Sequence, residues 1–313
     1  MCKLNETEVT MFLLLGFKNT YIINILLFNI VLLVYIAILF GNILIIFLVS
    51  INHLLHIPMY IFLKHLALAD LLFTTNIIPK MLCILLQEGS VISLQGCFVQ
   101  YYFHSLAIFT QSLILTTMSF DRYLAICQPL RYSTLMDYRM CFSLIFCSWA
   151  TGFILIPSEI AFLFQLKFCG SNIINHFFCD IAPLLQISTS DVTVVMWEDF
   201  AFAILVIFLP FVLIFISYMC IFFTILKITS STGRQKAFST CSSHLVTVCT
   251  YYGTLIAIYM VPAGENNVGD VKLISLLYTI LTPLINPLIY SIRNQEIRRY
   301  LQKHMCKHSN GES

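Results

Sequence analysis

Charge is what this 313-residue chain has least of. Only 10% of its residues are charged, whereas soluble globular proteins carry about 25%. Hydrophobic residues make up 59% of the chain, and the mean hydropathy is +0.89. So few charges cannot cover a surface for water, which excludes an ordinary soluble fold. The formal net charge of +2 gives no electrostatic support for binding nucleic acid.

Catalytic and transport patterns are also missing. The sequence contains no HExxH or GxSxG pattern, and its histidines are scattered. It has no evident internal repeat, and Asp70 is the only acid expected at mid-membrane, whereas transporters carry inverted repeats and several midplane charges. No basic segment leads into the apolar run at residues 11–16, so a cleavable signal peptide is not expected. A transporter or channel and a membrane enzyme are the weaker alternatives, and transport of a labelled solute would favour the former.

Long apolar segments are what the chain does have. Seven can be counted, at residues 22–49, 57–86, 97–127, 140–164, 196–226, 238–262 and 271–292. Each is long enough, as a helix, to cross a hydrocarbon core about 30 Å thick. Four prolines lie inside these windows: Pro157, Pro210, Pro283 and Pro287. Proline is tolerated in membrane helices. The sequence predicts an all-α membrane protein, a seven-transmembrane helix bundle that forms a single domain over residues 1–313.

The distribution of basic residues predicts the orientation of this bundle. If the C-terminus is cytoplasmic, twelve of the 17 lysines and arginines lie on the inner side. Residues 1–21 are then extracellular, and Asn5 begins a glycosylation sequon there. Residues 293–313 form a cytoplasmic tail, in which 294–303 predict a short amphipathic eighth helix on the membrane face.

Four cysteines fall on the outer side by this topology, where disulfides persist: Cys2, Cys97, Cys169 and Cys179. Cys97 opens the third window, and Cys179 lies midway in the long outer loop, residues 165–195. A bridge between them would pin the loop over the bundle and stabilise the fold by about 2–4 kcal/mol. From spacing alone, the alternative is that both cysteines are free thiols.

His176, Cys179 and Asp180 also resemble a metal-ligand set, but a disulfide would use Cys179, so no metal site is expected.

An ion pair, Asp121-Arg122, stands at the end of the third window. The 25 residues from Cys97 to Arg122 span about 37 Å of helix, which places Arg122 at the cytoplasmic face if Cys97 is at the outer one. Charge beside a bilayer is expensive and usually functional. The alternative is a structural pair whose arginine reaches lipid headgroups. The residues alone favour neither.

Sequence markers give a more specific prediction. In chain order they are Gly41-Asn42, HIPMYIFL (56–63), LALAD (66–70), MSFDRYLAIC (118–127), Ser217-Tyr218, KAFSTCSSH (236–244) and PLINPLIYSIRN (283–294). With these markers the chain resembles the olfactory (odorant) receptors of the rhodopsin-like G-protein-coupled receptor class, over nearly its whole length.

The resemblance implies a sensory function without enzymatic activity or cofactor. The ligand would be a small odorant, and the partner a stimulatory olfactory G protein that raises cyclic AMP. The receptor would lie in the plasma membrane of sensory cilia. The residues implied in the G-protein switch are Asp121, Arg122, Tyr123, Tyr218 and Tyr290. Asp121 would hold Arg122 at rest, and activation would free Arg122 to line the cavity that receives the G protein.

The resemblance also implies a polar core around Asp70, made with Asn42, Gln111 and Asn286. Asn42 and Asn286 are the expected partners of Asp70. Such a cluster can hold a sodium ion in the wider class. Gln111 stands where odorant receptors commonly have a glutamate, which removes one anionic ligand and favours a water-mediated polar network instead.

Two further departures lie on the outer side. The usual cysteine near Thr189 is missing, so Cys169 is either free or paired with Cys2. Glu159 replaces a commonly seen histidine near the outer end of the fourth window.

The ligand site is expected in the outer half of the bundle. On the third helix one face carries His104, Ser105, Ile108, Phe109 and Ser112. By analogy it is joined by residues of the fifth, sixth and seventh helices: Phe202, Leu205, Val206, Tyr252, Leu255, Tyr259, Tyr278 and Thr279. This mostly apolar set with a few polar groups suits a small volatile molecule. Ordinary helix packing is the alternative for any one of these residues.

Two patterns remain on the inner side. Ser239, Thr240, Ser242 and Ser243 are expected to cap the start of the sixth helix, with phosphorylation as the alternative. Cys306 follows the predicted eighth helix and is a candidate for palmitoylation.

Overall fold

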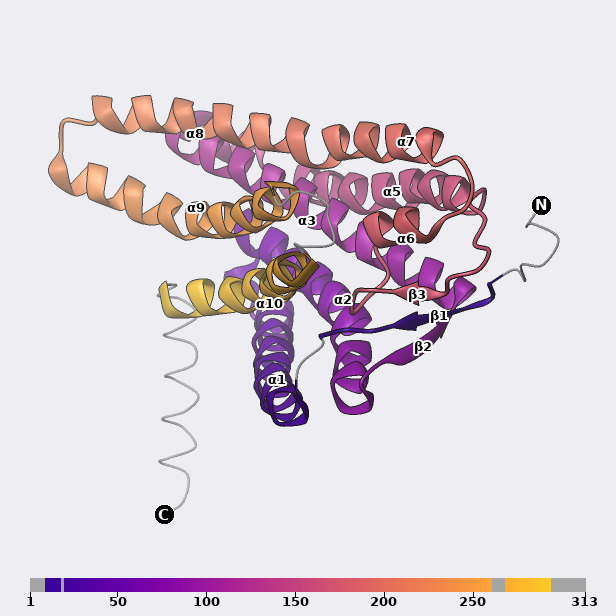
Figure 1. The fold of residues 1–313 in the computed structure, drawn as a ribbon. Coiled ribbons are helices and arrows are strands. Elements are labelled where there is room, and N and C mark those ends of the chain that lie inside the picture. Colours follow the sequence, from indigo (N-terminus) through magenta and orange to yellow (C-terminus); the bar gives the residue numbers. More distant parts are fainter. Residues whose placement is uncertain (1–8, 18–19, 261–267, 294–313) are drawn as a thin grey trace, which may run out of the picture.

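Seven helical crossings packed side by side form the body of the described structure, and a small sheet lies across one end of them (Figure 1). The computed structural model describes residues 9–17, 20–260 and 268–293. Cys2, Asn5, Cys306 and the predicted amphipathic segment 294–303 lie outside these ranges.

The crossings follow the chain in order. They are α1 (Tyr21–Ile51), α2 (Pro58–Gln87), α3 (Leu94–Cys127), α5 (Tyr138–Leu163), the continuous run of α7 (Thr193–Ala203), the π-helical segment η2 (Ile204–Phe208) and α8 (Leu209–Lys227), then α9 (Ser231–Met260) and α10 (Val268–Arg293). Short helices lie in the connections: the 3-10 helix η1 (His53–Leu55), α4 (Pro129–Leu135) and α6 (Ile181–Ile187).

Six of the described crossings are long and apolar enough to span a membrane by length and composition. The seventh is α3, which is more polar and has Gln100, Gln111 and Asp121 among its buried residues. It contacts α2, α5, α8 and α9, so it sits within the bundle. A helix enclosed by others needs no apolar outer face, which explains its composition.

The outer surfaces of the other helices are strongly apolar. Leu33, Phe40, Ile154 and Phe208 are each more than 60% exposed. In water such surfaces would associate, whereas lipid chains are as apolar as they are. The same reasoning limits what burial contributes inside the bundle, because moving leucine from lipid to a protein core gains packing and no hydrophobic transfer energy.

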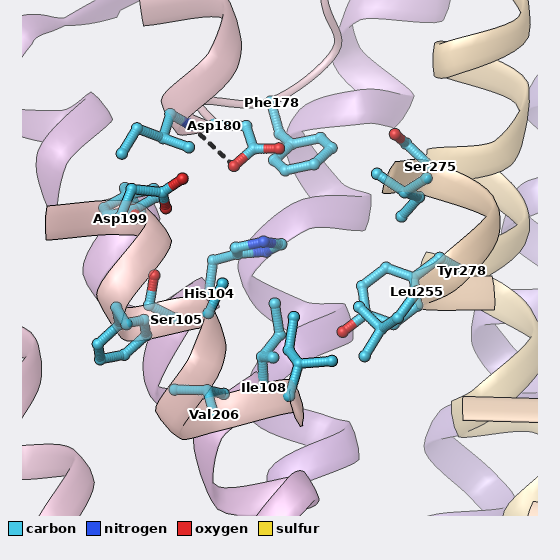
Figure 2. A pocket seen from close by; sticks show the side chains of 16 residues that line it. His104, Ser105, Ile108, Phe178, Asp180, Asp199, Val206, Leu255, Ser275 and Tyr278 are labelled. Carbon is cyan, nitrogen blue, oxygen red and sulfur yellow. Dashed lines mark hydrogen bonds between the residues drawn. The ribbon is translucent and has the colours of Figure 1, made fainter. Parts of the chain in front are cut away.

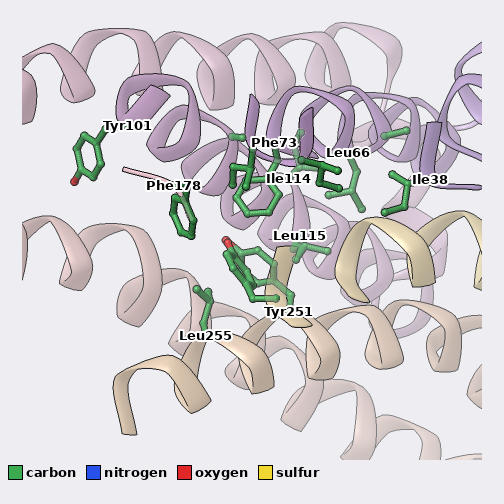
Figure 3. Close-up of a cluster of buried hydrophobic side chains, with 14 of the residues drawn as sticks. Ile38, Leu66, Phe73, Tyr101, Ile114, Leu115, Phe178, Tyr251 and Leu255 are labelled. Atoms are coloured by element: carbon green, nitrogen blue, oxygen red, sulfur yellow. The ribbon is translucent and has the colours of Figure 1, made fainter. Parts of the chain in front are cut away.

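Buried side chains of α1, α2, α3 and α9 meet in the middle of the bundle (Figure 3). Gly41 of α1 lies against Pro287 of α10, and a Cβ at position 41 would come within 2.9 Å of the Cβ of Pro287. This glycine therefore permits the close approach of the two helices.

Prolines in two crossings release backbone carbonyls that another helix then binds. Pro210 has no N–H for the carbonyl of Val206, four residues earlier, and Ser112 Oγ of α3 donates to that oxygen at 2.6 Å. Pro287 likewise has no N–H for the carbonyl of Pro283, and Asn42 Nδ2 of α1 donates to that oxygen at 3.0 Å. Each proline thus creates a hydrogen bond between helices, as the tolerance of proline in membrane helices requires.

The apolar run at residues 11–16 forms a strand at the centre of a three-stranded sheet. β1 (Met11–Leu14) pairs antiparallel with β2 (Ser90–Ser93), with Met11 opposite Ser93, and parallel with β3 (Ile173–Ile174). Phe12 is fully buried, edge-on to Phe168. This sheet was not predicted, because each strand is completed only by segments far away in the chain.

Disulfides fasten the long outer loop. The expected bridge between Cys97 and Cys179 is confirmed, with Cα atoms 5.4 Å apart. Cys179 N also donates to Gln100 Oε1 at 2.9 Å, so the loop is held to α3 at two points. Cys169 is disulfide-bonded as well, which makes its alternative reading as a free thiol wrong.

The start of the sixth crossing differs from the prediction. The expected window was 238–262, but α9 begins at Ser231. Ser239, Thr240, Ser242 and Ser243 therefore lie inside the helix, and their assignment as caps of its start is wrong. Ser230 caps the helix instead, because its Oγ accepts the N–H of Gly233 at 3.2 Å.

Candidate functional site

A cavity of about 100 Å³ lies between α3, α7, η2, α9, α10 and the long outer loop (Figure 2). It is smaller than the roughly 300–1,000 Å³ of pockets for drug-sized ligands. Its walls are Tyr101, His104, Ser105, Ile108, Phe178, Asp180, Ile181, Asp199, Phe202, Ala203, Val206, Ile207, Leu255, Ile258, Ser275 and Tyr278. A site of this size suits a small molecule with a few polar groups.

The structure brings together about half of the residues expected to bind a ligand. His104, Ser105, Ile108, Phe202, Val206, Leu255 and Tyr278 line the cavity. Phe109, Ser112, Leu205, Tyr252 and Thr279 do not. The backbone of Tyr259 lies in the last turn of α9, and its side chain is outside the described part.

The predicted ligand residues that do not line the cavity lie elsewhere in the bundle. Ser112 and Tyr252 bond to each other at 3.0 Å, and Thr279 donates to Ser275 O at 2.7 Å. Phe109 is buried against Leu106 and Ile156. Leu205 is 49% exposed on the outside of the bundle, so its expected place in the ligand face is wrong. It lies in the π-helical segment, whose wider turn changes the helical phase that the sequence periodicity assumes.

Sequence reasoning missed several residues of the wall. Phe178 and Asp180 flank Cys179, so the disulfide that holds the loop also places them at the cavity. Tyr101 precedes His104 by three residues, Asp199 precedes Phe202 by three, and Ser275 precedes Tyr278 by three, which is the spacing of neighbours on one helix face. Extending each predicted face by one turn outward would have found these three.

Polar groups gather at one end of the cavity. Asp180 and Asp199 both lie there, with the ring of His104 between them and the apolar residues (Figure 2). The Nδ1 atom of His104 makes no hydrogen bond to another described residue, although the residue is only 6% exposed. Behind the wall, Tyr101 Oη donates to the buried Glu159 at 3.4 Å. The outer end of the cavity is therefore acidic.

His176 is near this site but is held in an aromatic cluster. Its ring stacks on Phe177 at 4.7 Å and meets the edge of Phe178 at 4.6 Å. Burial, together with the nearby charge of Lys272, lowers the pKa of His176 to about 3, so the ring is neutral.

The described residues contain no group of three or more His, Cys, Asp and Glu side chains placed to hold a metal ion.

Deeper in the bundle, each oxygen of the Asp70 carboxyl group accepts a hydrogen bond from one amide. Gln111 Nε2 donates to Oδ1 at 2.9 Å, and Asn286 Nδ2 donates to Oδ2 at 2.8 Å. Asn42 is not a direct partner of Asp70, contrary to expectation, because its amide serves Ile38 O and Pro283 O. The network expected to run through water is thus direct at Asp70. It joins α2, α3 and α10 at one point.

At the other end of α3 from the cavity, Asp121 and Arg122 form a buried ion pair. Arg122 Nε donates to Asp121 Oδ2 at 2.9 Å, and Nη2 donates to the same oxygen. Tyr132 of α4 donates to Asp121 Oδ1 at 2.8 Å. Burial and the neighbouring Asp121 carboxylate raise the pKa of Tyr132, so its hydroxyl stays a donor.

The tyrosines expected in the switch lie near the same end. Tyr218 of α8 bonds to His244 Nδ1 of α9 at 2.7 Å, with the two rings stacked at 5.8 Å. Tyr290 of α10 is buried, and Tyr123 accepts from Gln128 at 3.3 Å. Tyr132 and His244 were not predicted as site residues. Their roles depend on contacts across helices that a single helical pattern does not contain.

Seven crossings around a polar third helix, with a cavity toward one end and a buried ion pair at the other, define a membrane bundle of the rhodopsin type. The crystal structure of squid rhodopsin superimposes with a TM-score of 0.75 over 95% of this chain and 89% of that one. Only 17% of the aligned residues are identical, so this likeness concerns the fold.

Sequence comparison gives the family. The family model described as Olfactory receptor matches residues 31–308. Olfactory receptor 10A3 of Homo sapiens is 43% identical over 97% of this chain and 96% of its own length, and Olfactory receptor 6E1 of Mus musculus is 42% identical over 97% of each. Olfactory receptor 5G3 of Homo sapiens is 44% identical over 94% of each chain. The chain belongs to the olfactory receptor family, whose members are multi-pass membrane receptors that signal through G proteins and are not enzymes.

Proposed function

We propose that this receptor binds a small, mostly apolar volatile molecule in the cavity beside α3 and activates a stimulatory heterotrimeric G protein, raising cyclic AMP. The observation that carries the proposal is the arrangement along α3. The cavity lies at His104 to Ile108, and the buried ion pair lies at Asp121 and Arg122, about four turns further along the helix.

Family membership supports the direction of signalling. The N-terminus faces outside and the C-terminus the cytoplasm, as the twelve of 17 basic residues on the inner side favour. The cavity then opens toward the outer half and the ion pair toward the G protein. Sensory cilia are the proposed site of action.

α9 supplies a physical link between the two ends. Leu255 and Ile258 line the cavity, and Tyr251 Oη donates to Ile108 O of α3 at 2.9 Å. Two turns toward the other end, His244 bonds to Tyr218. A ligand that prefers one position of α9 would therefore change the contacts of His244, because a ligand shifts a conformational equilibrium by its difference in affinity for the two states.

The ion pair supplies the switch. In the resting state Asp121 holds Arg122, which is 8% exposed. Activation moves α9 away and frees the guanidinium to contact the G protein, beside Tyr218 and Tyr290. Asp70 with Gln111 and Asn286 forms the polar contact between α2, α3 and α10 that must rearrange as the helices shift.

A cyclic AMP assay on cells that express Arg122→Ala tests the proposal. Odorants that activate the wild-type receptor should give no response in this variant at equal surface expression. Arg139→Ala is the matched control, because it removes an exposed arginine at the start of α5 and should keep the response. Intact responses in well-expressed Arg122→Ala would refute the switch, and uptake of labelled solute would favour a transporter.

A further inference from the structure

We infer that the cavity takes a small organic amine, with its ammonium group at Asp180 and Asp199 and its hydrocarbon part against Ile108, Val206 and Leu255. The inference rests on the proposed use of this cavity as the odorant site and adds the chemical class of the ligand. The starting observation is that two carboxylates line a cavity whose described wall contains no lysine or arginine.

The two acids differ in what they already bind. One oxygen of Asp180 accepts the N–H of Ile181 at 2.8 Å, which caps α6 and fixes the side chain in place. Its second oxygen is left for another donor. Asp199 makes no hydrogen bond or ion pair to any described residue and is only partly exposed. A carboxylate half removed from water without a partner is unfavourable, and a bound cation would relieve it.

More negative charge stands behind this pair. Asp199 lies close enough to Asp180 and Glu198 to be affected by their charges. None of these three acids is ion-paired to another described residue. Their mutual repulsion adds to the field in the cavity, and this field would attract a cation and repel a carboxylic acid.

His104 gives an independent indication that a polar ligand belongs here. Its ring points into the cavity between the acids and the apolar wall (Figure 2). Only 6% of the surface of His104 is exposed, and its Nδ1 has no partner among the described residues. Buried polar atoms are nearly always hydrogen-bonded, so an unpaired nitrogen on a ring that lines the cavity points to a polar partner that the described residues do not supply.

The rest of the wall defines the other part of the ligand. Opposite the acids the lining is aliphatic, with Ile108, Val206 and Leu255 (Figure 2). A cavity of about 100 Å³ has room for a short alkyl or small cyclic group. The shape and charge together fit a primary or secondary amine with one short apolar substituent.

Matched compounds on one carbon skeleton test the class. Butylamine and hexylamine, the corresponding primary alcohols and the corresponding carboxylic acids are applied to cells that express the full chain, with cyclic AMP as readout. The amine should activate at a concentration at least roughly tenfold lower than its alcohol, and the acid should be inactive. Equal or greater potency of the alcohol or the acid overturns the inference.

Substitutions locate the ammonium. Asp199→Asn should weaken the amine response by about tenfold or more and leave any alcohol response unchanged, because only the charged partner is lost. Asp180→Asn should have the same effect while still capping α6, since asparagine also accepts at that position. Asp191→Asn is the control and should leave the amine response unchanged, because it removes an exposed acid that does not line the cavity. An unchanged amine response in Asp199→Asn and Asp180→Asn overturns the inference.

Thermal unfolding of the purified full-length receptor separates this inference from the proposed function. If hexylamine raises the Tm of the wild type and not of Asp199→Asn, the amine site stands even when cyclic AMP does not change. If neutral odorants raise cyclic AMP and amines neither activate nor raise the Tm, the receptor function stands and the amine class is wrong. No response and no Tm shift with any amine also overturns the inference.

Discussion

The hydroxyl of Ser112 donates to the carbonyl oxygen of Val206 at 2.6 Å, which is the carbonyl that Pro210 leaves without its helical partner. This one hydrogen bond joins α3 to the π-helical segment directly below the cavity. It shows how a proline in a crossing can be used to fasten two helices where a site has to keep its shape.

Ser112→Ala should lower the thermal stability of the purified receptor. The substitution removes an interhelical hydrogen bond, worth about 0.6 kcal/mol on average in membranes, and leaves a buried carbonyl unpaired. We expect a loss of about 1–2 kcal/mol, seen as a lower Tm. Ser217→Ala is the control, because Ser217 bonds only within its own helix, to Leu213 O. Equal Tm values for wild type and Ser112→Ala would contradict the role given to this bond.

Asn42→Ala should have a similar effect at the contact between α1 and α10. Asn42 donates to Pro283 O at 3.0 Å, the carbonyl released by Pro287. Loss of the amide should lower both the Tm and the amount of receptor at the cell surface. Asn29→Ala removes an asparagine that bonds only to Ile25 O of its own helix. If that exposed control destabilises as much as Asn42→Ala, the interhelical bond is not the cause.

Tyr132→Phe should raise basal signalling. The change removes the 2.8 Å hydrogen bond to Asp121 Oδ1 and keeps the aromatic ring. Asp121 is then less firmly held beside Arg122, so the resting state loses stability relative to the active one. The measurement is cyclic AMP without ligand, divided by surface expression, with Tyr138→Phe at an exposed position as control. Basal signalling that stays the same or falls would show that Tyr132 does not support the resting pair.

The stability of the outer loop should depend on pH through His176. Its pKa is 6.5 in the unfolded chain and about 3 in the folded protein, so below pH 6.5 the unfolded chain takes up a proton that the folded one does not. The contribution of neutral His176 to the free energy of unfolding is therefore complete above pH 6.5 and is lost as the pH falls from about 6.5 toward 3. The Tm should drop between pH 7.5 and pH 5, and His176→Phe should reduce this drop. The same substitution at the exposed His53 should leave the drop unchanged. An identical pH dependence in wild type and His176→Phe would contradict the assignment.

Hydropathy and markers were enough to predict the helices, the place of Asp70 near the middle of α2 and the position of Arg122 near the end of α3. They could not predict which amide reaches Asp70, because that depends on how the helices are rotated against each other. Gln111 and Asn286 face it, while Asn42 turns to a carbonyl released by a proline.

The ligand face shows the same limit. His104, Ser105 and Ile108 follow from a regular α-helical face, and all three line the cavity. Leu205 was assigned by the same periodicity and lies outside, since the π-helical segment breaks the period. Asp180 and Phe178 come from a loop, so only the disulfide at Cys179 hinted at their place.

The most direct test of the central claim, that the outer cavity and the Arg122 end of α3 are coupled, is the affinity of an activating ligand with and without the G protein. Coupling between two binding sites is reciprocal, so the stimulatory heterotrimer should tighten ligand binding to the purified receptor by roughly 5- to 150-fold. Arg122→Ala should bind the ligand normally and lose this enhancement. Equal affinities in the presence and absence of the G protein would contradict the account.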